Sequence, residues 1–242
     1  MDVVTSRPIF LADTVSRNIH SHRPNALFFL AAFVIFASVL QVVATASIPF
    51  LIYALNSNGL MDSVKLHHIN IAINARNPHA FVLSESKTNS KTGPNLPNGD
   101  YNIFEEPGVQ SNNFHTYKWG VTAGIRKNIQ IAQHVAITAA SLCGHIVAVD
   151  IVLPTTTGKG FVHRMIGAYT PWDPGAPDTH DFWPDLTALV NSTTTSWSVA
   201  GDLNTTVSVS ECTSGGTNAC AQYFKFLTDV NAIDIWSNHP ER

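Results

Sequence analysis

The chain has 242 residues, a formal charge of −3 and a charged fraction of only 13%. This length allows one large domain or two small ones, and the charge excludes a protein whose overall electrostatic field attracts nucleic acid. The three scattered cysteines exclude an even disulfide framework, and the eleven histidines show no Cys/His zinc spacing.

The N-terminal part divides into a polar tail, residues 1–25, and a long apolar segment, residues 26–46. No charged residue occurs between positions 25 and 61. The apolar segment matches the roughly 20 residues that a helix needs to cross a bilayer, and the arginines before it would keep the N-terminus in the cytosol. We therefore predict a transmembrane or signal-anchor helix over residues 26–46. The alternatives are a signal peptide with its cleavage site at Ala44-Thr45-Ala46, a buried helix, and the opening strand of a core.

From residue 48 onward, short apolar segments alternate with polar turns. Strands are predicted at residues 48–55, 80–83, 101–104, 120–125, 146–153 and 161–169, and in the segment that begins at Trp197. Helices are predicted after Asp62 or Ser63, after Asp181, and over residues 219–230.

In the first helix, positions 64, 68, 71, 72 and 75 share one face. Residues 88–100 are rich in Asn, Ser, Gly and Pro and are expected to form a mobile loop. Strands outnumber helices, and the hairpins suggest antiparallel pairing. The pattern predicts an α/β fold, a four-layered sandwich of two packed, mainly antiparallel sheets flanked by helices.

Polar residues stand at the ends of four of these apolar strands. They are Asn56 with Asn58, Glu85, Tyr169, and Asp202 with Asn204. Rigid strands can aim several side chains at one point, so strand ends are where functional sites collect. The structural alternatives are a simple turn for the Asn and Asp residues, an exposed strand-end acid for Glu85, and a core aromatic for Tyr169.

Two of these positions have a direct chemical interpretation. If the strand continues through residues 202 and 204, Asp202 and Asn204 point to the same face. A carboxylate can then take a proton from water while a carboxamide donates to a developing oxyanion. Glu85, directly after a buried strand, can hold Mg²⁺, which prefers oxygen ligands and few protein carboxylates.

This ordered set resembles the endonuclease/exonuclease/phosphatase family, metal-dependent phosphodiesterases that include abasic-site nucleases and the endonucleases of LINE-type retrotransposons. The matching segments are LNSNGL (55–60), VLSESK (82–87), AYTPW (168–172) and GDLN (201–204). The segments GFVHRMIGAYTPWD and SGG…FLTDV…DIW are most similar to the retroelement-type branch. The resemblance covers a domain over residues 48–242 and none of the first 47.

The resemblance implies a divalent metal, Mg²⁺ or Mn²⁺, and assigns residues to its site. It implies that Glu85 holds the metal and that Asn56 assists the metal site or its hydrogen-bond shell. Asn58 stands where many family members have Asp, so a possible metal or second-shell contact is weaker here.

The resemblance also assigns the groups that act on the substrate. It implies that Tyr169 donates to the scissile phosphate and that Asp202 orients or deprotonates the attacking water. Asn204 is implied to bond either the phosphate or Asp202. These roles agree with what in-line displacement at phosphorus needs: a positioned water, a Lewis acid, and donors to the developing charge.

The C-terminal end departs from the family pattern. Members end with a Ser-Asp-His segment after another acidic strand position, whereas His239 is followed by Pro240 and does not fit that motif. We therefore expect a domain that is incomplete at its C-terminus and lacks its last strands. Loss of one charge-stabilising donor costs about 10²–10³ in rate, so weak or absent activity is expected.

The sequence therefore predicts a Mg²⁺-dependent phosphodiester hydrolase, most similar to a retroelement-type DNA endonuclease. Its expected substrate is DNA or another phosphodiester. Its expected location is the membrane if residues 26–46 insert, and otherwise the nucleus or cytoplasm. Two alternatives stay open: a membrane-anchored or secreted phosphodiesterase of the same family, and a non-catalytic membrane-tethered relic.

Overall fold

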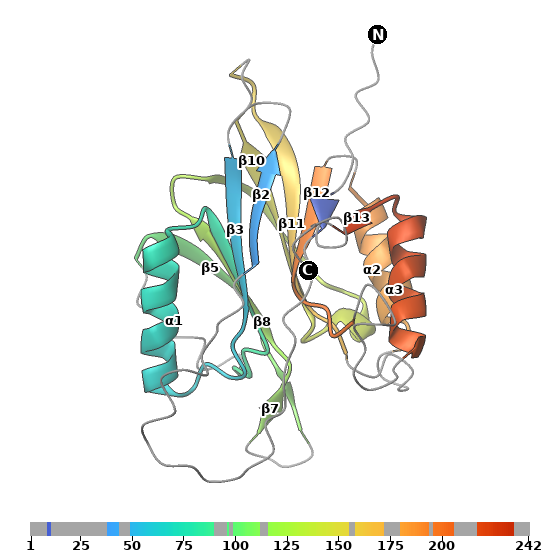
Figure 1. The fold of residues 1–242 in the computed structure, drawn as a ribbon, viewed down its shortest axis with the longest axis horizontal. Coiled ribbons are helices and arrows are strands. Elements are labelled where there is room, and N and C mark those ends of the chain that lie inside the picture. Colours follow the sequence, from blue (N-terminus) through green and yellow to red (C-terminus); the bar gives the residue numbers. More distant parts are fainter. Residues whose placement is uncertain are drawn as a thin grey trace.

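The computed structural model describes residues 9–10, 38–43, 49–89, 96, 99–111, 116–154, 158–171, 180–193, 196–205 and 217–234. These residues form two β-sheets packed face to face, with helices on both outer faces (Figure 1). The α/β sandwich predicted from the sequence is confirmed.

The two sheets contain strands from distant parts of the sequence. One has the order β13 (Ile233–Asp234), β1 (Ile9–Phe10), β12 (Ser196–Asp202), β11 (Phe161–Tyr169), β10 (Ile146–Leu153) and β9 (Gln130–Val135). The other has the order β2 (Ser38–Val43), β3 (Pro49–Asn56), β4 (Ala80–Ser84), β8 (Val121–Arg126) and β5 (Tyr101–Glu106). A separate hairpin joins β6 (Val109–Gln110) to β7 (Tyr117–Lys118).

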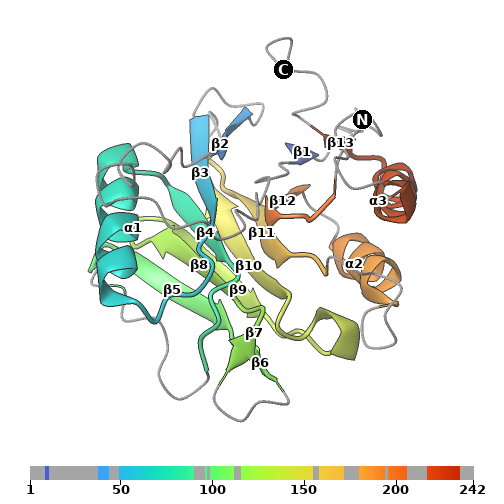
Figure 2. The same cartoon turned by 60° about the horizontal axis from the view of Figure 1, so that its bottom comes forward.

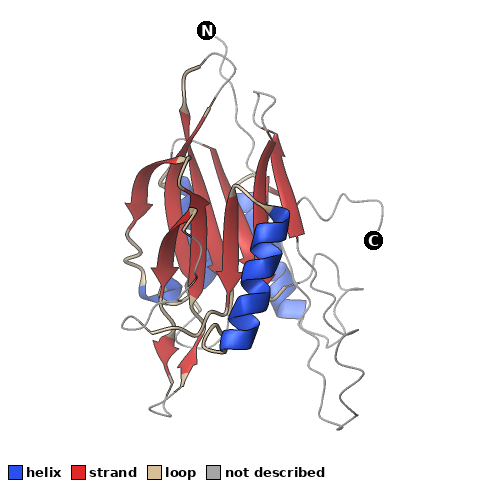
Figure 3. Cartoon of the chain, turned by 90° about the vertical axis from the view of Figure 1, so that its left-hand side faces the viewer, coloured by secondary structure: helices blue, strands red, loops and turns tan. Residues whose placement is uncertain are grey.

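The helices complete the outer layers. Helix α1 (Ser63–Arg76) covers the five-stranded sheet (Figure 3), while α2 (Phe182–Asn191) and α3 (Thr217–Asp229) lie on the six-stranded sheet. A short 3₁₀ helix, η1 (Ala140–Leu142), precedes β10. Three apolar clusters fill the layers, one under α1, one between the sheets and one under α2 and α3. Burial of these clusters is the main favourable contribution to folding.

Helix α1 begins and ends at the predicted residues but buries a different face. The Asp62 side chain caps it by accepting a bond of 2.9 Å from the Lys65 backbone N–H, and Asn77 ends it in the left-handed region. The buried side chains include Ile69, Ala72 and Ile73. Val64 and Ile71 of the predicted face are 64% and 53% exposed. The helix carries apolar residues on two sides, so only the sheet beneath it decides which side is buried.

The predicted membrane helix over residues 26–46 is wrong for the part that the structure describes. Ser38–Val43 form strand β2, which pairs antiparallel with β3 from Ser38 opposite Ala54 to Val43 opposite Pro49. Three of its six residues are β-branched valines, which favour strands. This outcome matches the alternative of an opening strand of the core; the rest of 26–46 lies outside the described residues. Among the described helices, none is both long enough and apolar enough to cross a membrane.

Five of the described strands were not predicted. Strand β9 forms an edge of its sheet and is mostly exposed, so its sequence, QIAQHV, has neither a buried apolar run nor a clean alternation. Strands β1, β6, β7 and β13 have two residues each, too few to show any period. The loop predicted at 88–100 lies mostly outside the described residues.

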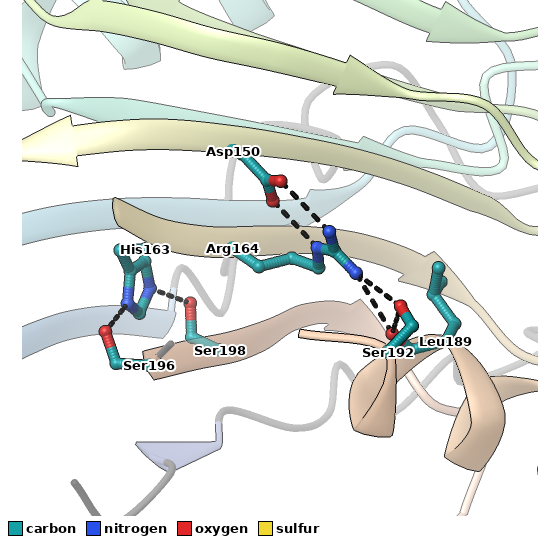
Figure 4. A network of polar contacts seen from close by, with 7 residues as sticks. All are labelled: Asp150, His163, Arg164, Leu189, Ser192, Ser196 and Ser198. Atoms are coloured by element: carbon teal, nitrogen blue, oxygen red, sulfur yellow. Dashed lines mark hydrogen bonds and ion pairs between the residues drawn. The ribbon is translucent and has the colours of Figure 1, made fainter. Parts of the chain in front are cut away.

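A buried polar network holds α2 against the six-stranded sheet (Figure 4). The Arg164 guanidinium on β11 donates from Nε to Asp150 Oδ1 at 2.7 Å and from Nη2 to Asp150 Oδ2 at 2.9 Å. Its Nη1 donates to the Leu189 carbonyl and to Ser192 Oγ at the end of α2. This two-bond pair satisfies the buried Asp150, and the remaining donors fix the helix end.

Candidate active site

The predicted site residues gather where four strands end. Asn56 is the last residue of β3 and lies opposite Ser84, the last residue of β4, in a parallel pair. Tyr169 is the last residue of β11 and lies opposite Asp202, the last residue of β12, in a second parallel pair. The ends of the four strands therefore meet at one edge of the sandwich.

Asp202 is the most buried of the candidate residues. Its side chain is fully buried, and both carboxylate oxygens accept hydrogen bonds. Asn56 Nδ2 donates to Oδ2 at 2.6 Å, and the Asn204 backbone N–H donates to Oδ1 at 3.0 Å. These two donors offset the cost of removing a carboxylate from water.

Asn204 lies in a turn beyond the strand, so the predicted shared strand face is wrong. Strand β12 ends at Asp202, and Asn204 has a φ of 45° in the left-handed region. The bond from the Asn204 N–H back to the Asp202 side chain is an Asx turn, which Asp and Asn side chains form. The turn that follows β12 therefore contains both candidate residues, Asp202 and Asn204. Asn204 Nδ2 donates to the Thr170 carbonyl at 2.6 Å, which fixes its side chain beside β11.

Asn56 has its orientation set at both ends of its amide. Its Oδ1 accepts the Asn58 backbone N–H at 2.8 Å, while its Nδ2 donates to Asp202. The two partners leave one sensible placement of oxygen and nitrogen. Asn56 therefore acts on Asp202 as a donor.

Tyr169 is surrounded by the other candidate residues. Burial raises the pKa of its phenol to about 12, and the nearby carboxylates of Glu85 and Asp202 add to that shift. A side-chain hydrogen bond from Asn204 lowers the pKa in part. A phenol with this pKa keeps its proton at any ordinary pH, so Tyr169 is a hydrogen-bond donor.

Glu85 carries an ion pair with a residue that the sequence analysis did not assign. Lys87 Nζ lies 2.8 Å from Glu85 Oε1 and also donates to Asn58 Oδ1 at 2.7 Å. Lys65 Nζ donates to the Asn58 backbone carbonyl at 2.8 Å. Asn58 thus belongs to the Glu85 side of the site, and its amide oxygen and the Glu85 carboxylate face the same point.

Backbone strain is concentrated around these residues. Of the seven non-glycine residues with positive φ in the described part of the chain, four are Asn58, Glu85, Lys87 and Asn204. Each such residue costs about 1–3 kcal/mol and persists only where its surroundings fix it, as they often do at functional sites. The loops are fixed here by bonds such as Gly59 N–H to the Glu85 carbonyl, 2.7 Å, and Lys87 N–H to the Trp119 carbonyl, 2.8 Å.

Ser84 links the two sheets beneath the site. Its side chain is fully buried, and its hydroxyl accepts the Asp202 backbone N–H at 3.0 Å and donates to the Ala168 carbonyl at 2.8 Å. It was not predicted as a site residue, because a serine at the end of a strand gives no sign of a partner 118 positions away.

A row of aromatic rings extends from Tyr169 to the β6–β7 hairpin, which projects at one end of the sandwich (Figure 2). The His145 ring lies 6.2 Å from Tyr169, nearly parallel at 11°, and 4.2 Å from the Trp119 ring. His145 Nδ1 is 2.6 Å from the Tyr169 carbonyl oxygen, and Lys118 Nζ lies 3.9 Å from the centre of the Trp119 ring. No local pattern in the sequence indicates this row, because its members come from separate segments.

The donor set suits a hard divalent cation that keeps most of its water. Among the described residues, no three His, Cys, Asp or Glu side chains form a metal-binding group. Mg²⁺ needs only one or two carboxylates, with waters and neutral oxygens filling the other positions. Glu85 and the Asn58 amide oxygen already converge on one cation, the Lys87 ammonium, so these residues fit such an ion.

Comparison with solved structures finds the same fold in AP endonucleases. The AP endonuclease LMAP from Leishmania major matches with a TM-score of 0.55 and 15% identity, over 74% of this chain and 66% of that one. The Xenopus laevis APE2 catalytic domain matches with a TM-score of 0.53 and 14% identity, over 72% and 67%. An AP endonuclease from Archaeoglobus fulgidus matches with a TM-score of 0.53 and 14% identity, over 73% and 69%. Neither a protein-family model nor a curated protein matches the sequence.

These likenesses establish the fold that the sequence resemblance implied. The match to the Leishmania protein spans slightly less than two thirds of that protein's length. Because the sequence identities are low, the roles of residues in those proteins cannot be assigned to residues of this chain.

Proposed function

We propose that this protein is a divalent-metal-dependent phosphodiester hydrolase that cleaves DNA, as a retroelement-type endonuclease. The observation that carries the proposal is the buried Asp202 carboxylate, held by Asn56 and Asn204 beside the protonated Tyr169. The shared fold with proteins named as AP endonucleases supports DNA as the substrate class. Because the proposed substrate is DNA, we propose a nuclear or cytoplasmic location.

In this proposal Asp202 acts on the attacking water. Its two oxygens are held by donors on opposite sides, so the carboxylate keeps one orientation while it accepts a proton from the water. Asn56 is a positioning residue, because it acts through Asp202. Fixing the base in advance removes an entropic cost from the reaction step.

Tyr169 and Asn204 stabilise the charge that develops on the phosphate. The Tyr169 phenol donates to a non-bridging oxygen, and its pKa of about 12 keeps the donor protonated. One Asn204 side-chain N–H is bonded to the Thr170 carbonyl, which leaves the other for the substrate or for Tyr169. A Mg²⁺ or Mn²⁺ ion held by Glu85, with Asn58 and Asn56 at its side, supplies Lewis acidity when bound.

The test is Mg²⁺-dependent nicking of supercoiled plasmid by the full chain, beside Asp202→Asn and Glu85→Gln. We expect nicking by the wild type, repeated with Mn²⁺, and a loss of at least about 10² in both variants. Asp229→Asn is the matched control, because it neutralises a carboxylate on α3, outside the site. Full activity of Asp202→Asn, or no wild-type nicking with either metal, would contradict the proposal.

A further inference from the structure

The Lys87 ammonium occupies the point where the two cation-binding oxygens of the site converge. It lies 2.8 Å from Glu85 Oε1 and 2.7 Å from Asn58 Oδ1, although these oxygens come from different loops. The side chains of Lys87 and Glu85 are 34% and 20% exposed, so the pair is only partly open to water. An ion pair at such a position differs from an ordinary surface pair, because a third residue completes it.

The backbone holds Lys87 in this position. Both Glu85 and Lys87 have left-handed backbone angles, with φ of 56° and 54°. The Lys87 N–H donates to the Trp119 carbonyl, and the lysine stem lies along Gly59, where an added Cβ would be 3.6 Å from Lys87 Cδ. The strained loop therefore directs the ammonium toward Glu85.

A divalent ion at this point competes with the Lys87 ammonium for the same oxygens. Glu85 supplies one negative charge and Asn58 none, so the Lys87 ammonium alone neutralises the pair of oxygens. A divalent ion at Glu85 has to displace the ammonium or lie beside it, and repulsion between charges a few ångströms apart is substantial even in a water-like dielectric.

We propose that Lys87 is a built-in competitor of the divalent metal and sets the metal concentration at which the site fills. This inference rests on the proposed function, since it takes Glu85 to be a metal ligand. Its chemical content is an exchange: the ammonium leaves the Glu85 carboxylate when Mg²⁺ or Mn²⁺ arrives. No covalent step is involved.

The test is direct metal binding, which needs no catalysis. Titration calorimetry with MgCl₂ and electron paramagnetic resonance with MnCl₂ would compare the full-length wild type with Lys87→Met. We expect the Kd for either metal to fall roughly tenfold in the variant, as removal of a unit charge beside a divalent ion predicts. The double variant Lys87→Met/Glu85→Gln should lose this gain, which assigns the bound metal to Glu85.

Lys65→Met is the matched control. Lys65 Nζ also contacts Asn58, but it bonds the backbone carbonyl and not Glu85. Lys65→Met removes a positive charge next to Asn58, as Lys87→Met does, but it leaves the Glu85 ion pair intact. We therefore expect the Kd to change less than threefold. Lys87→Gln is a second variant that keeps a polar side chain, and circular dichroism checks that each variant is folded.

The outcomes separate this inference from the proposed function. If the wild type binds metal and nicks plasmid, but neither Lys87 variant binds metal more tightly, the competitor role is wrong and the hydrolase stands. An equal gain from Lys65→Met would also overturn it, because the effect would then be general electrostatics. If neither the wild type nor the Lys87 variants bind metal at millimolar concentrations, both proposals fail.

Discussion

Tyr169 shows how burial decides the chemistry of a single residue. Its phenol is enclosed beside two carboxylates, and its pKa of about 12 is well above the ordinary value of 10. An acid this weak cannot serve as a base at neutral pH, but it keeps its proton and stays a hydrogen-bond donor. The same environment that disfavours ionisation therefore keeps the donor in place.

We predict that Tyr169→Phe lowers the nicking rate about 10²-fold with little change in the free energy of unfolding. Tyr101→Phe is the contrasting variant. Its hydroxyl donates to the Pro78 carbonyl at 2.7 Å, far from the reaction, so it should cost about 1 kcal/mol of stability and leave the rate unchanged. Plasmid nicking and urea unfolding measure the two effects. A Tyr169→Phe variant that nicks plasmid as fast as the wild type would contradict the assigned role.

At the scale of elements, the site depends on contacts that join the two sheets. Ser84 on β4 bonds both Asp202 on β12 and Ala168 on β11, and its hydroxyl has no exposed surface. One small side chain thus fixes the ends of β4, β11 and β12 relative to one another. Its removal would leave a buried N–H and a buried carbonyl without their hydroxyl partner.

We predict that Ser84→Ala lowers the free energy of unfolding by about 1–3 kcal/mol, because it leaves buried polar groups without partners. Metal-dependent nicking should fall as well, since the Asp202 backbone loses its anchor. The comparison is Ser57→Ala, whose hydroxyl donates only to backbone carbonyls of the β4 end and does not reach β12. Equal loss of nicking in the two variants would show that the link across the sheets is unimportant.

The Arg164–Asp150 pair attaches helix α2 to the six-stranded sheet. We predict that Arg164→Met lowers the free energy of unfolding by about 3–5 kcal/mol, because Asp150 is left as an unpaired buried charge. Asp150→Val in the same chain should recover much of that loss, since two apolar side chains need no partners. Urea unfolding of the four proteins of the double-mutant cycle measures the coupling. Additive losses would mean that the pair does not act as a unit.

At the scale of the whole molecule, the sequence specified the sandwich but not its details. Apolar strands and polar strand ends are local signals, so most strands and the residues Asn56, Glu85, Tyr169 and Asp202 could be chosen in advance. The apolar run that contains strand β2 predicts a helix, because such a run has no period that separates a core strand from a membrane span. Lys87 and Ser84 have no local sequence signal, because their partners lie on other strands and loops.

A partly buried glutamate and a buried histidine give the molecule opposing responses to pH. Burial raises the pKa of Glu105 from 4.5 to about 7, so the folded protein holds a proton that the unfolded chain releases. Stability from this group is complete below pH 4.5 and is lost as the pH rises through 7. Burial lowers the pKa of His163 from 6.5 to about 4, so its stability is complete above pH 6.5 and is lost as the pH falls through 4.

Between pH 4.5 and 6.5 the two contributions therefore change in opposite directions, and removing one should reveal the other. Glu105→Gln keeps an acceptor for the Thr88 hydroxyl but removes the buried charge. We predict that it raises the free energy of unfolding by about 1 kcal/mol at pH 8, allowing for partial exposure, and leaves it nearly unchanged at pH 4.5. Urea unfolding at the two pH values tests this, with Asp229→Asn as an exposed carboxylate control.

Because the His163 contribution remains, the variant should lose stability more steeply than the wild type as the pH falls from 7 to 4.5. An equal effect at both pH values would show that Glu105 is not the titrating group.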